Sequence, residues 1–158
     1  MEQSPVDAPR RATTADTATV AMLLDAFNRE YATPTPGAAV LEARIGPLLA
    51  GADVVALLTG DPAVGLAVLT LRPNVWYDGP VALLDELYVV PAMRGRGLGS
   101  ALLASVESQA RQVGAELVQI NVDGEDTAAR RFYERHGYTC HEPGQDEPSL
   151  YYSRELGS

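Results

Sequence analysis

The sequence predicts a mixed α/β fold, in which helices form layers on a central sheet. Segments with helical periodicity alternate with short apolar runs that end in turn residues, in the order helix, helix, hairpin, strand, helix, strand, helix, strands. With 46% hydrophobic and 21% charged residues, the 158-residue chain has the length and composition of one globular domain with a buried core. We therefore expect a single domain over residues 1–158, with residues 1–9 as a flexible leader.

The N-terminal third predicts one short strand followed by two helices. Residues 10–13 form the expected strand, and Thr14 or Asp16 is the expected N-cap of the first helix. The Pro- and Gly-containing run 33–37 breaks this helix, and the second helix ends near Gly51. Both helices have an apolar face, made of Val20, Leu23, Leu24, Phe27 and Tyr31 in the first and of Leu41, Ile45, Leu48 and Leu49 in the second.

The middle of the chain predicts a hairpin and then a longer strand. Residues 53–59 and 63–71 are two apolar runs separated by a turn that contains Gly and Pro, which is typical of a hairpin. Residues 81–90 are apolar except for Asp85 and Glu86. Two adjacent carboxylates in a buried strand are costly unless they have a partner or a function.

The last third predicts a helix, a strand, a helix and two closing strands. Residues 97–114 have helical periodicity, and residues 117–122 form a short apolar run. A short helix is expected over 126–136. Residues 138–141 and 150–154 are expected to form the closing strands.

Charge and cysteine content limit the classes of partner. The net charge is −9, and all twelve basic residues are arginine, so the surface repels nucleic acid and anionic lipid. The acidic excess serves either solubility or attraction of a cationic substrate. No apolar run is long enough to span a membrane, the N-terminus does not resemble a signal peptide, and Cys140 is the only cysteine. We expect a cytoplasmic protein that binds neither nucleic acid nor membrane.

A glycine-rich segment between the strand at 81–90 and the next helix predicts an anion site. Glycines let the backbone approach a ligand, and the amides at a helix start attract negative charge. The glycine spacing does not fit a dinucleotide-binding fingerprint, and a P-loop would need a lysine that the chain lacks. A strand-to-helix turn that binds nothing remains the alternative. The predicted pyrophosphate-binding residues are Arg94, Gly95, Arg96, Gly97, Leu98, Gly99 and Ser100.

This segment resembles the pyrophosphate motif of the GNAT family of N-acetyltransferases, Gln/Arg-x-x-Gly-x-Gly/Ala. The run Ala129-Arg130-Arg131-Phe132-Tyr133-Glu134-Arg135-His136-Gly137-Tyr138 resembles the second signature of the family, Ala-x-x-Phe-Tyr-Glu-x-x-Gly-Phe/Tyr. Asn121 on the intervening strand also fits as a cofactor contact. The chain departs from the family at Asp126, where the family often has an asparagine that contacts the cofactor. An acid there can cap the helix but cannot donate as an amide does.

The resemblance implies a central mixed, mostly antiparallel twisted sheet with splayed central strands that receive acetyl-CoA. The pantetheine arm of acetyl-CoA would pair with backbone groups of Leu87 and Val89. Tyr133 matches the general acid of the family, because a phenol is protonated at neutral pH and can donate to a leaving thiolate. The alternative for Tyr133 is a core tyrosine.

Glu86 is the candidate general base or amine anchor, and Asp85, Trp76 and Tyr77 are candidate substrate contacts. Because neighbouring strand residues point to opposite faces, we expect only one of the two acids to face the cleft. The alternatives are a surface acid for Glu86 and Asp85, and packing under a loop for the aromatic pair. Cys140 and the residue after it, His141, are expected to be structural, and no spacing predicts a metal site.

The sequence therefore predicts an acetyl-CoA-dependent N-acetyltransferase that acts on a primary amine of a small molecule by direct attack, with either a cationic or another small amine as acceptor. The alternatives are an acyl-CoA sensor without turnover and an acetyltransferase for proteins or peptides. Neither the acceptor, nor the length of the acyl group, nor a homodimer interface can be identified from the sequence.

Overall fold

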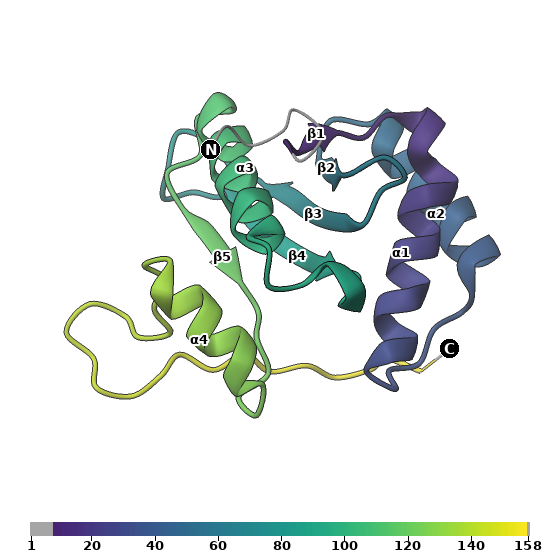
Figure 1. Cartoon of the computed structure of the whole chain (residues 1–158). Coiled ribbons are helices and arrows are strands. Elements are labelled where there is room, and N and C mark those ends of the chain that lie inside the picture. Colours follow the sequence, from purple (N-terminus) through teal and green to yellow (C-terminus); the bar gives the residue numbers. More distant parts are fainter. Residues whose placement is uncertain (1–7, 158) are drawn as a thin grey trace. The chain divides into compact units, whose positions relative to one another are not determined.

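The computed structural model describes residues 8–157, which divide into two compact units that meet at residues 121 and 122 (Figure 1). We describe each unit by itself, and the expectation of a single domain stays a prediction. Most of the predicted leader, residues 1–7, lies outside the described part of the chain.

The first unit contains a sheet and three α-helices, in an order that agrees with the sequence analysis. Two short 3-10 turns, η2 and η3, precede α1 and the glycine-rich segment. The elements are β1 (Arg10–Arg11), η2 (Thr14–Asp16), α1 (Thr17–Glu30), α2 (Ala38–Ala50), β2 (Val54–Thr59), β3 (Gly65–Arg72), β4 (Val81–Val89), η3 (Pro91–Met93), α3 (Leu98–Gln112) and β5 (Val118–Ile120).

The five strands are ordered β1-β2-β3-β4-β5. The first four are antiparallel neighbours, and β5 is parallel to β4, so the sheet is mixed and mostly antiparallel as predicted. The hairpin of β2 and β3 is confirmed. The contact between β4 and β5 is short, because it covers only Ala82–Leu84 on β4. Beyond Leu84, β4 continues without β5 beside it, which is the splay that the resemblance implies.

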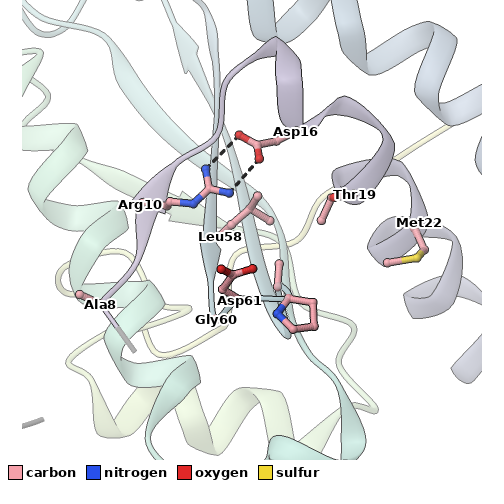
Figure 2. A pocket seen from close by; sticks show the side chains of 10 residues that line it. Ala8, Arg10, Asp16, Thr19, Met22, Leu58, Gly60 and Asp61 are labelled. Carbon is pink, nitrogen blue, oxygen red and sulfur yellow. Dashed lines mark hydrogen bonds and ion pairs between the residues drawn. The ribbon is translucent and has the colours of Figure 1, made fainter. Parts of the chain in front are cut away.

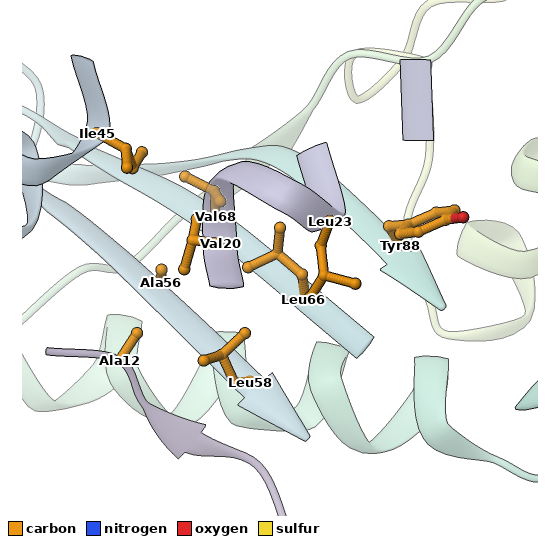
Figure 3. Packing of buried hydrophobic residues seen from close by; sticks show 9 residues of the cluster. All are labelled: Ala12, Val20, Leu23, Ile45, Ala56, Leu58, Leu66, Val68 and Tyr88. Atoms are coloured by element: carbon orange, nitrogen blue, oxygen red, sulfur yellow. The ribbon is translucent and has the colours of Figure 1, made fainter. Parts of the chain in front are cut away.

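Alternating residues of the strands pack into two cores, one on each face of the sheet. Figure 3 shows the first core, where Leu66 and Val68 lie beside Val20 and Leu23 of α1, and Tyr88 is a further member of the same cluster. The other face packs against α3, since α3 contacts β2, β3 and β4 and Leu102 lies beside Gly65. Fully buried side chains on this second face include Leu57, Leu69, Leu102, Leu103 and Val106.

The helix α1 follows Asp16, one of its two predicted N-caps, and the 3-10 turn η2 before it begins with a capping box of its own. The N-cap is Thr13, whose hydroxyl accepts from Ala15 N at 3.3 Å, while Asp16 Oδ2 accepts from Thr13 N at 2.8 Å. The reciprocal pair needs Thr13 outside the helix, so β1 is also shorter than expected. Thr14 is therefore not a cap. Asp16 is the N-cap of α1 by position, but its side chain makes no cap bond to α1 and instead supplies the returning carboxylate of the box.

A β-bulge in β4 changes which residues share a face. Val68 of β3 pairs with Glu86, but the next residue, Leu69, pairs with Leu84. Asp85 is therefore the extra residue of the bulge. The alternation of side chains before Asp85 is out of phase with the alternation after it, which the apolar pattern of the strand does not reveal.

The second unit contains α4 (Thr127–Arg135), which is confirmed as a helix capped by Asp126, whose Oδ1 accepts from Ala129 N at 3.0 Å. The expectation of two closing strands is wrong, since 138–141 and 150–154 are irregular in the structure. Ser149 N donates to Cys140 O at 2.7 Å, but no ladder continues from this bond within the described residues. Strand propensity does not produce a strand without a pairing partner.

Candidate active site

The glycine-rich segment has the conformation expected of an anion-binding loop. Gly95 and Gly97 have φ values of 75° and 80°, a region that side-chain-bearing residues rarely adopt. Gly97 is the N-cap of α3, and no side chain caps this helix end. Leu98 is buried and fixes the first turn on the sheet. The exposed loop and the positive end of the α3 dipole thus face the surface together, which suits a pyrophosphate.

Arg94 connects this loop to β4 and α1. Its Nε donates to Val89 O at 2.9 Å, and its NH2 donates to Glu30 Oε1 at 2.8 Å. The Tyr88 hydroxyl donates to the same carboxylate at 3.0 Å. Burial alone would raise the pKa of Glu30, but hydrogen bonds from Arg94 and Tyr88 outweigh it and lower the pKa. The Arg94 charge is therefore largely compensated by Glu30, a contact that the sequence analysis missed.

The backbone groups of Leu87 and Val89 point away from β3. Val90 N donates to the O atom of Val64, the residue before β3, at 2.9 Å, so by alternation the β4 residues whose backbone groups face β3 are Tyr88 and Glu86. Leu87 and Val89 alternate with these residues and face the side on which β5 has already ended. Val89 O already accepts from Arg94 Nε, so an amide-bearing chain that pairs with β4 would use the backbone groups of Leu87 and the amide of Val89. The role of these groups in binding pantetheine stays a prediction.

The bulge brings Asp85 and Glu86 to the same face of the sheet. Glu86 pairs with Val68 of β3, whose side chain is in the α1 core. Asp85 Oδ2 accepts a short hydrogen bond from the hydroxyl of Thr70, which lies two residues after Val68 on β3. The premise that the two acids point to opposite faces is therefore wrong, while the role of either acid at an acceptor stays a prediction. Regular alternation fails at a bulge, and Thr70 is a contact that the sequence analysis missed.

Burial raises the pKa of the Glu86 carboxyl, and the nearby Asp85 carboxylate raises it further. Asp85 keeps exposed surface, yet enough protein surrounds its carboxyl to raise its pKa as well, and the hydrogen bond from Thr70 acts in the opposite direction. A carboxylate with a raised pKa is better suited to accept a proton from an amine than an ordinary surface acid is.

The aromatic loop before β4 has a defined backbone. Asn74 Oδ1 accepts from Trp76 N at 2.8 Å and from Tyr77 N at 2.9 Å, and Asn74 Nδ2 donates to Gly79 O at 3.0 Å. The Trp76 side chain is 85% exposed, so it does not pack under its loop. A role for Trp76 and Tyr77 in binding an acceptor stays a prediction.

Tyr133 lies on α4, in the second unit. Its ring makes edge contacts with Phe132 and Tyr138, at centroid distances of 5.1 and 5.9 Å. Asn121 is exposed at the end of β5, in the first unit. The roles of Tyr133 and Asn121 stay predictions. The structural role expected for Cys140 and His141 is not supported by burial, since both are exposed.

A separate hollow of about 750 Å³ lies between β1, α1 and the turn after β2 (Figure 2). Its one arginine, Arg10, forms a bidentate pair with Asp16 at 2.8 and 3.0 Å. None of the predicted site residues lines it. Among the residues that the structure describes, no group of His, Cys, Asp and Glu could hold a metal, and no helix could cross a membrane.

Comparison with known proteins identifies the family. Residues 21–138 match the model of the acetyltransferase (GNAT) family. The chain belongs to this family. The predicted family and fold class are thereby confirmed, and the glycine-rich loop lies inside the matched region. Acetyl-CoA is the co-substrate typical of GNAT enzymes.

Individual relatives agree with this membership. A protein from Arthrobacter sp. FB24, described with its crystal structure as a candidate acetyltransferase, is 60% identical with a TM-score of 0.91, over 99% of this chain and 100% of that one. The aminoalkylphosphonate N-acetyltransferase of Salmonella typhimurium is 40% identical over 83 residues, which are 52% of this chain and 53% of the relative. This GNAT chain therefore matches about half the length of that curated relative.

An aminoglycoside N-acetyltransferase solved in complex with CoA shares the fold, with a TM-score of 0.76 over 99% of both chains. The two sequences are 18% identical, so this likeness concerns the fold alone.

Proposed function

We propose that this GNAT protein is an acetyl-CoA-dependent N-acetyltransferase whose acceptor is a primary amine of a small, cationic molecule. The observation that carries the proposal is that β4 leads through the glycine-rich loop directly into α3. This segment offers the backbone groups of Leu87 and the amide of Val89 for pantetheine, and a helix N-terminus at Gly97 for pyrophosphate. The similarity to an aminoalkylphosphonate N-acetyltransferase supports a small amine as acceptor.

The proposed reaction is a direct transfer in a ternary complex. The amine nitrogen attacks the thioester carbon, and a backbone amide on β4, that of Val89, stabilises the negative charge on the carbonyl oxygen. The C–S bond then breaks, and Tyr133 protonates the leaving thiolate. The proton of the amine passes to Glu86, directly or through a water. Asp85, Trp76 and Tyr77 are the proposed contacts of the cationic acceptor.

The test is thiol release from acetyl-CoA over a panel of amines, amino acids, aminoglycosides and peptides. We expect release with one chemical class, and a loss of about 10²- to 10⁴-fold in kcat for Tyr133→Phe with unchanged affinity for acetyl-CoA. Tyr151→Phe, which alters an exposed tyrosine in the same unit, is the matched control and should keep full activity.

Other outcomes lead to different conclusions. Full activity of Tyr133→Phe removes Tyr133 from the mechanism. Binding of acetyl-CoA without release for any acceptor favours the second candidate, an acyl-CoA sensor, and release with peptides alone favours a protein acetyltransferase. Absence of both binding and release contradicts the proposal. A cytoplasmic location and a homodimer are further parts of the proposal, testable by fractionation and by light scattering.

A further inference from the structure

We propose that Asp85 is a positioning residue for Glu86. Thr70 holds Asp85 in its charged form on the same face of the sheet as Glu86, so that Glu86 is the carboxylate that accepts the proton of the amine. This inference rests on the proposed function, since it concerns the base of that reaction. It assigns separate tasks to two acids that the sequence alone does not distinguish.

The bulge brings the two carboxylates to one face of the sheet. Without an extra residue in β4, adjacent side chains would point to opposite faces. The register instead places Glu86 opposite Val68, and Asp85 reaches Thr70, which shares a face of β3 with Val68. The two carboxylates are therefore neighbours on one face, and the charge of Asp85 acts on Glu86.

The two carboxylates have different surroundings. The Thr70 hydroxyl donates to Asp85, which stabilises the charged form of that carboxyl. Burial and the Asp85 charge both disfavour the charged form of Glu86. When two interacting carboxyls share one proton, the proton resides on the acid whose charged form is less stabilised. That acid is Glu86, so Asp85 remains charged while Glu86 gains and loses the proton.

The other charged groups on this face are engaged elsewhere. Arg72, further along β3, donates to Gln119 Oε1 of β5 at 2.9 Å. Glu30 of α1 is paired with Arg94 and also accepts hydrogen bonds from the hydroxyls of Tyr88 and Tyr31. Among the residues that the structure describes, Asp85 is the charged group that acts on Glu86.

The first test is a direct titration of the side-chain carboxyls by ¹³C NMR in the full chain, which needs no acceptor. We expect the titration midpoint of Glu86 to lie above its ordinary value and to move to lower pH in Asp85→Asn. Asp53→Asn, an exposed acid at the start of β2, is the matched control and should leave the Glu86 midpoint unchanged. An unmoved Glu86 midpoint in Asp85→Asn overturns the proposal.

A substitution at Thr70 provides a second test, which does not depend on whether Asp85→Asn folds. Thr70→Val removes the hydroxyl that donates to Asp85, so the Asp85 midpoint should move to higher pH, and Thr70→Ser should restore it. An Asp85 midpoint that is the same in both Thr70 variants contradicts the role assigned to Thr70.

Kinetics separate this inference from the proposed function. The ratio of kcat/KM for Asp85→Asn to that of wild type is measured across pH with the best amine of the panel, which cancels the titration of the amine. We expect the ratio to rise as pH falls, because the variant keeps Glu86 deprotonated at lower pH. A ratio independent of pH overturns the inference alone. Full activity of Glu86→Gln instead removes Glu86 as the base of the proposed reaction.

Discussion

Arg94 contributes to the site mainly through what it connects. Its guanidinium bonds Val89 O at the end of β4 and Glu30 at the end of α1. A glycine-rich loop with arginines predicts that Arg94 adds positive charge at the pyrophosphate. The structure indicates a second task, which is to hold the loop before α3 in place.

This interpretation predicts the behaviour of two variants. Arg94→Ala should weaken acetyl-CoA binding about tenfold or more, and Glu30→Gln should weaken it in the same direction although Glu30 carries the wrong charge to bind a phosphate. Calorimetric titration with acetyl-CoA measures both. If Glu30→Gln instead tightens binding, Arg94 acts through its charge and not through the order of the loop.

The glycines and the bulge show how far single residues could be predicted. Gly95 and Gly97 were identifiable from the motif, and their positive φ values explain why the motif requires glycine. The bulge at Asp85 could not be predicted, because a bulge depends on the pairing of two strands and leaves no mark in the polarity pattern of one. The contact with Thr70 follows from the bulge, so it was missed for the same reason.

At the scale of elements, helices and paired strands were predictable, while unpaired segments were not. Each helix has its own periodicity, and β2 to β4 are apolar runs bounded by turns. The closing strands depend on a partner at a distance, and the predicted ones contain side chains such as Tyr152 that are 88% exposed. Their apolar content indicated strands, but pairing is a property of the fold and not of the segment.

The capping box before α1 should make stability depend on pH. The hydrogen bond from Arg10, and after it that from Thr13, hold the pKa of Asp16 well below its ordinary value of 3.8. A carboxyl with a lowered folded-state pKa stabilises the fold above the unfolded pKa, and this stabilisation is lost as pH falls through the folded pKa.

Asp16→Asn should therefore lower the free energy of unfolding by about 1 kcal/mol at pH 7. The difference from wild type should shrink as the pH falls below about 4. Urea unfolding at a series of pH values measures the effect, with Asp53→Asn as a control. A difference that is the same at pH 7 and pH 2 would show that the charge of Asp16 does not contribute.

At the scale of the whole molecule, the charge of −9 should act oppositely on the two substrates. The field attracts a cationic acceptor and repels acetyl-CoA, and salt screens both effects. Between about 20 and 200 mM salt, kcat/KM for a polycationic acceptor should fall by roughly 2- to 10-fold, while KM for acetyl-CoA should not rise. Steady-state kinetics at neutral pH and several salt concentrations provide the measurement, with an acceptor that has a single amino group for comparison. Equal salt dependence for both acceptors would show that the acidic surface serves solubility alone.

The bulge in β4 shifts by one residue the pattern of which side chains share a face of the sheet. Before Asp85, odd-numbered residues such as Leu83 lie on the face of the sheet that packs against α1, and after it even-numbered residues such as Glu86 and Tyr88 do. A mutant library that varies every second position along β4 would cross from one side of the sheet to the other at this point. Efforts to change acceptor preference should therefore randomise Leu83, Asp85 and Glu86 together. Deletion or insertion of one residue at this point would move the side chains on one side of it to the opposite face of the sheet.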